Sequence, residues 1–134
     1  SSVFVYDVID AYGGVKKFYR KFYISSICPL GFTSLQPGGK EVNYNYYDSA
    51  ALRKAAYPFI VNSLKEQLQW NISREVCYCM GTGKNAAFLQ ALNEKEKFFG
   101  KVIPLEHPRF VMQYKSKTKS QYIDKYLAAF EEHP

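Results

Sequence analysis

His107 is the residue of this sequence best suited to take part in a reaction. The chain contains two histidines, and the other one, His133, is the penultimate residue. The apolar run before His107, Lys101–Leu105, predicts a strand, and Pro108 prevents that strand from continuing. The pattern therefore predicts an imidazole at the carboxyl end of a strand, where open α/β sheets bind their ligands.

A segment rich in cations and aromatic residues follows His107. It reads Arg109-Phe110-Val111-Met112-Gln113-Tyr114-Lys115-Ser116-Lys117-Thr118-Lys119, and we predict a loop there. Such a loop can push an apolar wedge into a nucleic-acid groove while its cations hold the phosphates. The alternative is that Phe110 and Met112 pack inward and that the lysines are the solvated entry of a helix. The sequence leaves both interpretations open.

A glycine-rich turn lies between a predicted strand and a predicted helix. Its sequence, Gly81-Thr82-Gly83-Lys84-Asn85-Ala86, fits the G-x-G-x-x-G/A spacing, so backbone N–H groups can face a phosphate at the start of the helix. Glu106 follows the next strand, about where a ribose-binding acid is expected. The turn is not a Walker A loop, because Asn85 follows Lys84 where that motif requires Ser or Thr. Nucleotide binding and contact with one DNA phosphate are both compatible with it.

Two further groups of residues have polar or nucleophilic chemistry. In residues 43–48, asparagines and tyrosines precede a helix, which Asp48 or Ser49 is expected to cap, and the tyrosines can also stack on bases. The three cysteines, Cys28, Cys77 and Cys79, are predicted to lie in or at the end of buried strands. With two histidines in the chain they supply no convincing zinc quartet, so we predict reduced thiols and no metal site.

Length and composition limit the class of protein. The 134 residues correspond to one domain, and we expect a single domain over residues 1–134. A formal charge of +6 favours an anionic partner. No apolar stretch approaches the ~20 residues that span a bilayer and no leader peptide is apparent, so we expect a soluble, cytoplasmic protein without a membrane partner. The sequence carries no signal of the oligomeric state.

Periodicity and turn residues predict an alternation of strands and helices. Helices are predicted over residues 3–12, 15–20, 84–92 and 120–131, and another begins at Ala50, with Pro58 expected to kink or split it. Strands are predicted over residues 22–28, 75–80 and 101–105, and residues 31–47 are predicted to form a long loop. This alternation indicates an α/β fold with a parallel sheet covered on both faces.

Three segments resemble, in the correct order, motifs of the uracil-DNA glycosylase superfamily. They are residues 23–32, which contain Cys28-Pro29-Leu30, residues 81–85, and His107-Pro108-Arg109-Phe110. The sequence is most similar to the single-strand-selective monofunctional branch and a related bacterial domain. The resemblance implies a three-layer α/β/α sandwich around a four-stranded parallel sheet. It also implies a DNA repair hydrolase that flips a damaged base and cleaves its N-glycosidic bond, without a cofactor.

The resemblance also implies roles for individual residues. His107 matches the histidine that stabilises the departing base. The residues implied to contact DNA are Thr82, Gly83 and Lys84 in a phosphate-holding turn and Arg109, Phe110, Gln113, Lys115 and Lys117 in the groove-facing segment. Ser26, Cys28 and Asn45 are implied to lie near the base pocket. Ser26 occupies the position of a base-reading asparagine, so uracil selectivity is open and xanthine becomes a second candidate substrate.

One motif of the family is absent from the sequence. A Gly-x-Asn-Pro-Gly-like segment, which positions the hydrolytic water, would lie before residue 1. We therefore expect the chain to correspond to the C-terminal portion of a longer glycosylase, and the activity of the chain alone stays open. The alternatives are a nucleic-acid-binding protein without catalysis and a nucleotide-binding enzyme that uses the Gly81-Thr82-Gly83 turn.

Overall fold

The computed structural model describes residues 2–26, 32–35, 41–44, 47, 49–70 and 72–132. The chain forms two compact units, which are described separately. The first unit comprises Ser1–Tyr23 and Arg74–Pro134, and the second comprises Ile24–Ser73. Among the described residues, no helix has both the length and the apolar character needed to cross a bilayer.

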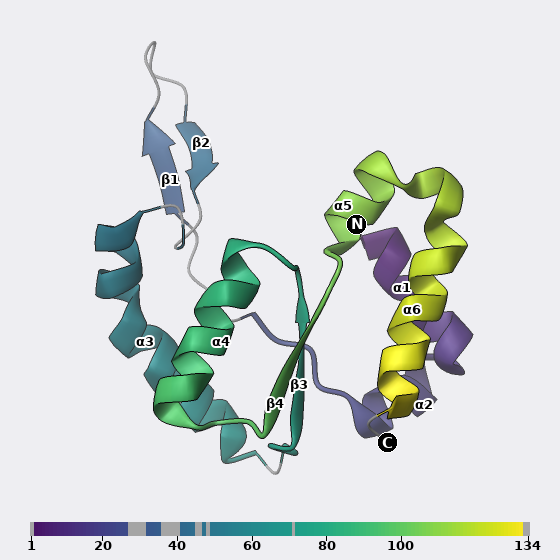
Figure 1. The fold of residues 1–134 in the computed structure, drawn as a ribbon, viewed down its shortest axis with the longest axis horizontal. Coiled ribbons are helices and arrows are strands. Elements are labelled where there is room, and N and C mark those ends of the chain that lie inside the picture. Colours follow the sequence, from purple (N-terminus) through teal and green to yellow (C-terminus); the bar gives the residue numbers. More distant parts are fainter. Residues whose placement is uncertain are drawn as a thin grey trace. The chain divides into compact units, whose positions relative to one another are not determined.

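The first unit combines helices with a parallel two-stranded sheet (Figure 1). Strands β3 (Val76–Met80) and β4 (Lys101–Leu105) pair in parallel, with Val76 opposite Lys101 and Met80 opposite Leu105. The helices are α1 (Ser2–Tyr12), α2 (Val15–Lys21), α4 (Lys84–Glu96), α5 (Pro108–Tyr114) and α6 (Lys119–Glu132), and a 3-10 turn covers Ser116–Thr118. The predicted α/β class and parallel sheet are confirmed.

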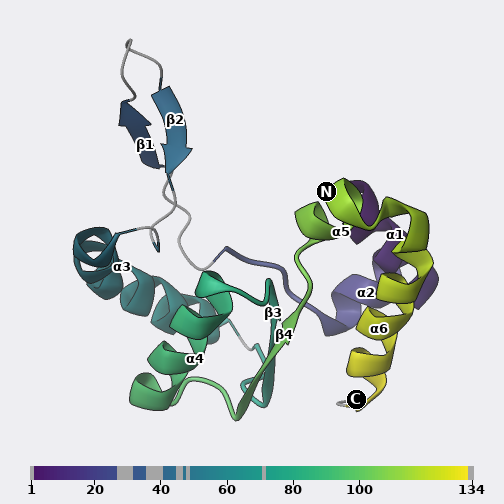
Figure 2. The same cartoon turned by 45° about the horizontal axis from the view of Figure 1, so that its top comes forward.

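The sheet of the first unit is covered on both faces (Figures 1 and 2). Helix α4 contacts both strands from one side. On the other side, the ring of Tyr78 lies 5.0 Å from that of Phe130 on α6, and its hydroxyl donates to the carbonyl oxygen of Ala129 at 3.2 Å. The core on this side consists of Phe4, Val8, Ile9, Phe18, Leu105, Val111, Tyr126 and Phe130. The first unit is thus a three-layer α/β/α arrangement.

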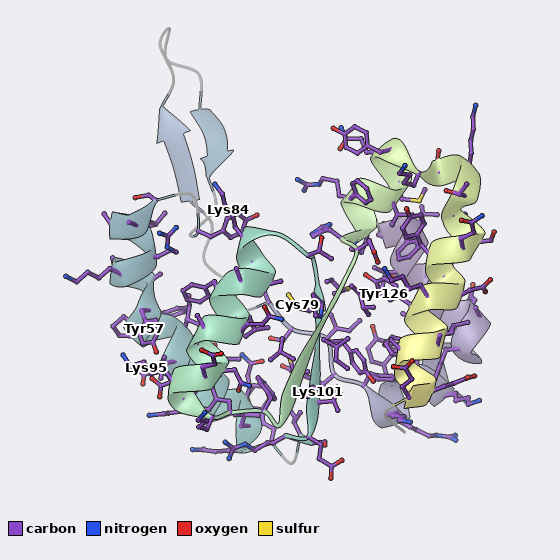
Figure 3. The ribbon with its side chains drawn as sticks, in the orientation of Figure 1. Tyr57, Cys79, Lys84, Lys95, Lys101 and Tyr126 are labelled. Carbon is purple, nitrogen blue, oxygen red and sulfur yellow. The ribbon has the colours of Figure 1, made fainter. Side chains whose placement is uncertain are left out.

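The face of β3 that contacts α4 carries two cysteines, as the alternation of strand side chains predicts. Cys79 is buried, and Figure 3 shows it between the sheet and α4. Burial raises the pKa of Cys77 to about 12, and it also raises that of Cys79. Both thiols therefore stay protonated at neutral pH and act as apolar packing groups.

Two consecutive glycines end α1, as predicted. Gly13 and Gly14 have φ angles of +134° and +101°, which L side chains rarely adopt. The N–H of Gly14 donates to the carbonyl oxygen of Ile9 at 2.9 Å and so satisfies one of the last carbonyls of the helix.

The strand predicted over residues 22–28 is wrong for its described part. Residues 22–26 have no regular structure, and residues 27 and 28 lie outside the described residues. Phe22 instead packs into an aromatic cluster, 4.9 Å from the ring of Phe18 and 4.6 Å from that of Phe130. Tyr23 and Ile24 are exposed. β-branched and aromatic residues favour a strand only where a neighbouring strand pairs with them. Residues 22–26 instead continue from the C-terminal end of α2 without regular structure.

The second unit contains a helix and a hairpin. Helix α3 (Ala50–Leu68) is capped by Ser49, whose hydroxyl accepts a hydrogen bond from the N–H of Leu52 at 3.3 Å. Pro58 lies inside this helix without splitting it. The buried side chains of this helix are Ala56, Ile60, Val61 and Leu64.

The prediction of a long loop over residues 31–47 is wrong for residues 32–35 and 41–44, which form strands. Strands β1 (Phe32–Leu35) and β2 (Glu41–Tyr44) pair antiparallel, with Phe32 opposite Tyr44 (Figure 2). The Pro37-Gly38-Gly39 sequence between them is typical of a hairpin connection flanked by β-forming residues. Two strands this short differ little in composition from a loop, so the sequence pattern did not distinguish the two.

Candidate functional site

The two strand ends of the first unit meet beside His107. Because the strands are parallel and Met80 is opposite Leu105, the carboxyl ends of both strands lie side by side at the same end of the sheet. The N–H of Gly81 donates to the carbonyl oxygen of Leu105 at 2.6 Å, which ties the two exits together. A Cβ atom on Gly81 would lie 3.8 Å from Cδ2 of His107. The glycine-rich turn and the histidine, which the sequence predicted separately, therefore form one site.

A hydrogen bond determines which nitrogen of His107 carries the proton. His107 is the N-cap of α5, and its Nδ1 accepts the N–H of Arg109 at 3.0 Å. Partial burial of the ring lowers the pKa of His107, and the positive charge of Arg109 lowers it further. A neutral imidazole whose Nδ1 is an acceptor carries its proton on Nε2. His107 therefore presents Nε2–H as a donor at the edge of the sheet.

The segment after His107 is helical, which corrects the predicted loop over residues 109–119. Pro108 occupies the first position of α5, where its fixed φ and missing N–H are favourable, and His107 supplies the cap. Val111 is fully buried, whereas Phe110 is 40 % exposed. The alternative in which Phe110 and Met112 both pack inward is wrong for Phe110, and Met112 does pack against the core.

Helix α5 and the turn after it present cations and an aromatic residue to solvent. We call this the α5 surface and define it as the exposed residues Arg109, Phe110, Gln113, Lys115 and Lys117. The ring of Phe110 lies 5.8 Å from that of Tyr114 and 6.5 Å from that of Tyr122. These neighbours support an apolar tip between the charged groups.

The glycine-rich turn leads directly into α4. Gly83 is the N-cap and provides no side-chain cap, and the first turn of the helix contains no acidic residue. Thr82, Gly83 and Lys84 are all exposed. The first N–H groups of a helix have no partner within the helix and favour an anion. The predicted phosphate-holding turn thus has the geometry and the charge for that role.

Glu106 has a structural partner, which weakens its interpretation as a ribose-binding acid. Its Oε1 forms an ion pair with Nζ of Lys125 on α6. Burial alone would raise the pKa of Glu106, but the hydrogen bond and charge of Lys125 lower it overall. The carboxylate is therefore ionised at neutral pH, and its Oε1 is already paired within the protein.

Of the three residues predicted to lie near the base pocket, the structure describes one. Ser26 belongs to the second unit and is exposed. Cys28 and Asn45 lie outside the described residues. Within the described ranges, no cluster of three or more His, Cys, Asp or Glu side chains could hold a metal ion.

Sequence reasoning missed the residues of α6 that reach the site. Tyr126 is buried in the core, and its hydroxyl donates to the carbonyl oxygen of Glu106 at 2.5 Å. The spacing of Tyr122, Tyr126 and Phe130 indicated a buried helix face. It gave no sign that a hydroxyl from that face contacts the residue before His107.

Two comparisons with known proteins gave matches. A model of the family described as the uracil DNA glycosylase superfamily matches residues 1–131. The chain is also similar to wild-type SMUG2 of Pedobacter heparinus, a crystal structure, with a TM-score of 0.92 and 56 % sequence identity. That likeness covers 98 % of this chain and 56 % of the SMUG2 chain, so this chain spans little more than half of its length. A search of curated protein sequences gave no significant match.

The family match extends over nearly the whole chain and includes both strand ends and His107. The chain therefore belongs to the uracil DNA glycosylase superfamily.

Proposed function

We propose that this chain supplies the leaving-group side of a DNA repair glycosylase that hydrolyses the N-glycosidic bond of a flipped, deaminated base. The observation that carries the proposal is the neutral His107, which has its Nδ1 occupied by the N–H of Arg109 and its Nε2–H left as a donor. The family membership supports the same conclusion. We further propose that residues 1–134 belong to one glycosylase domain that acts on DNA in the cytoplasm.

In this mechanism His107 stabilises the departing base. As the bond between the sugar and the base breaks, the sugar becomes oxocarbenium-like and negative charge develops on a base oxygen. The Nε2–H of His107 donates a hydrogen bond to that oxygen, and water attacks the sugar carbon to complete the hydrolysis. One donor of this kind lowers the barrier by ~3–4 kcal/mol. No step requires a metal ion or an organic cofactor.

DNA is held on both sides of His107. The exposed turn at Thr82–Lys84 offers N–H groups and one cation to a phosphate. The α5 surface presents Phe110 between cations, which suits an apolar wedge that keeps the base flipped while phosphates are neutralised. The energy of these contacts offsets the few kcal/mol needed to unstack the base.

Two bases are candidate substrates. Uracil follows from the family, and xanthine becomes a candidate because Ser26 occupies the position of a base-reading asparagine. A hydroxyl group can reorient as donor or acceptor, whereas an amide offers both in one fixed plane. A serine at that position is therefore expected to accept a wider set of base edges than an asparagine.

The test is base release by the natural protein that contains this sequence. His107→Ala is expected to slow release from single-stranded DNA containing uracil or xanthine by about 10²–10³-fold, because one transition-state hydrogen bond is lost. Release is measured as abasic sites that alkali converts to strand breaks. His107→Asn is the matched control, since asparagine is a good N-cap and preserves α5 without placing an imidazole donor.

Three outcomes decide between the functions. Slow release in both variants, with α5 intact in His107→Asn, supports the proposal. Unchanged release in His107→Ala would remove this histidine from the mechanism. Salt-dependent DNA binding by the wild type without any abasic product would identify a non-catalytic nucleic-acid-binding protein instead.

A further inference from the structure

Two adjacent residues of α6 hold the residue that precedes His107. The hydroxyl of Tyr126 donates to the main-chain carbonyl oxygen of Glu106 at 2.5 Å. Nζ of Lys125 forms an ion pair with Oε1 of the same glutamate. Glu106 lies 20 residues away from Tyr126 along the chain, so helix α6 fixes both the backbone and the side chain at the end of β4.

The contact at the carbonyl constrains His107. The carbonyl group of Glu106 belongs to the planar peptide unit whose nitrogen is that of His107, so fixing this carbonyl limits the rotation of the whole plane. His107 has φ −63° and ψ 135°, and its ring is held separately by the N–H of Arg109. The backbone and the imidazole are thus held by two hydrogen bonds, and a rotation of the peptide unit would also move the ring away from the N–H of Arg109.

Tyr126 is itself rigidly placed. It is 4 % exposed, and its ring packs edge-on against Phe4 at 5.2 Å and against Phe130 at 6.2 Å. Figure 3 shows it on the sheet-facing side of α6. Burial raises its pKa, so the hydroxyl remains a donor at all physiological pH values. Because this side chain has little conformational freedom, the position of α6 determines where the carbonyl of Glu106 lies at the end of β4.

We propose that Tyr126 is a positioning residue for His107, which it places by fixing the Glu106–His107 peptide unit. The inference rests on the proposed role of His107 in base release. Lys125 contributes less, because its side chain is 57 % exposed and its ion pair is screened by solvent.

The chain offers a matched pair of variants for the test. Tyr126→Phe removes the hydroxyl and leaves the ring that packs in the core. Tyr78→Phe is the control, since the hydroxyl of Tyr78 also donates to a main-chain carbonyl, but that of Ala129 in α6 rather than that of Glu106. Both variants lose one internal hydrogen bond, typically ~1 kcal/mol of stability. Only Tyr126→Phe loses the bond that reaches the peptide unit of His107.

The first measurement is the imidazole tautomer by ¹⁵N NMR on the chain without DNA. The chain has two histidines, and a His133→Gln background leaves the signals of His107 alone. The wild type and Tyr78→Phe are expected to show Nε2–H with an unprotonated Nδ1. Tyr126→Phe is expected to give a measurable fraction of Nδ1–H, because the displaced ring no longer accepts the N–H of Arg109. Identical spectra for all three proteins would overturn the inference.

The second measurement is base release by the natural protein at saturating and limiting DNA. Tyr126→Phe is expected to lower kcat by about tenfold or more relative to Tyr78→Phe with KM nearly unchanged, since small displacements of a catalytic group are costly. Equal kcat in the two variants would contradict a positioning role. If the wild type releases no base, the proposed function fails, while the NMR comparison still decides whether Tyr126 positions the imidazole.

Discussion

The two ends of the parallel sheet in the first unit are built for different purposes. At the amino ends of β3 and β4, side chains are used to satisfy the backbone. The guanidinium of Arg74 donates to the carbonyl oxygens of Phe98 and Lys97, at 2.8 and 3.3 Å. Both polar atoms of the Asn93 amide bond the backbone of Phe99.

The carboxyl ends of the same strands reverse this arrangement. There the backbone of Arg109 and the hydroxyl of Tyr126 fix the position of His107, and an imidazole N–H is left as a donor. The residues Thr82, Gly83 and Lys84, which follow β3, are exposed. At the opposite end of the sheet, in contrast, side chains form hydrogen bonds with the backbone of the loops. The comparison shows how the functional end of a sheet can be recognised. Its side chains are held in place by hydrogen bonds, while their own N–H groups remain available to a ligand.

The two glycines next to the strands provide the largest expected contrast. Gly100→Ala would place Cβ 2.9 Å from the carbonyl oxygen of Glu75, so the backbone must move, and we expect a loss of up to about 3 kcal/mol in the free energy of unfolding. Gly81→Ala would make only an ordinary contact with Cδ2 of His107, at 3.8 Å, but requires a φ of +151°, which costs about 1–3 kcal/mol. Urea denaturation measures both losses.

The same pair separates stability from function. Gly81→Ala is expected to slow base release beyond its effect on folding, because Gly81 adjoins His107. Gly100→Ala is expected to leave release unchanged at temperatures where it is folded. A release defect in Gly100→Ala alone would reverse the assignment of the two ends.

Asn93 gives the next largest effect. Asn93→Ala removes two hydrogen bonds to Phe99, of 2.9 and 2.8 Å, and we expect a loss of about 2 kcal/mol in the free energy of unfolding. Asn93→Asp keeps an acceptor for the N–H of Phe99 and should lose less. Thermal denaturation with base release below the transition checks that only stability changes. A normal melting temperature in Asn93→Ala would mean that this end is not held as described.

Two lysines test whether DNA approaches the proposed edge. Lys84 and Lys101 are both exposed, and Figure 3 shows them at opposite ends of the first unit. Lys84→Gln is expected to reduce the slope of log affinity against log salt concentration by up to about 0.7–0.9, the value for one phosphate contact. Lys101→Gln should leave the slope unchanged. Equal slopes in fluorescence-anisotropy titrations of the two variants would place the DNA elsewhere.

The smallest expected effect is a dependence of stability on pH. The pKa of His107 is lowered from 6.5 in the folded protein, so the unfolded chain binds the proton more readily. Stability from the neutral imidazole is therefore complete above pH 6.5 and is lost as the pH falls through the folded pKa. The stability difference between wild type and His107→Asn should be constant above that pH and change below it in urea titrations. A constant difference at all pH values would mean that the pKa is not lowered.

The sequence predicted those elements whose signals are local. β3, α4 and β4 follow from apolar runs, turn glycines and helical periodicity within each segment, and the edge at His107 follows from their parallel order. A loop was expected after His107 because Pro108 ends the preceding strand. Pro108 at the first position and a capping histidine were the local signals for a helix.

Interactions that join distant segments could not be predicted. The strand over residues 22–28 was expected from composition alone. Strand formation also depends on a pairing partner, which the composition of the segment does not reveal. Tyr126 presented only the signal of a core tyrosine. The contact of its hydroxyl with Glu106 depends on how α6 packs on the sheet, which one sequence does not reveal.

The proline in β4 has a consequence for which edge of the sheet can be extended. The carbonyl of Leu105 accepts from Gly81 and so faces β3, and alternation along the strand turns the nitrogen of Pro104 to the outer side. Proline has no N–H, so the outer edge of β4 lacks a donor near its carboxyl end, at the fourth of its five residues. Such an edge resists adding strands from neighbouring molecules and protects against aggregation. Any extension of this sheet is therefore favoured at β3.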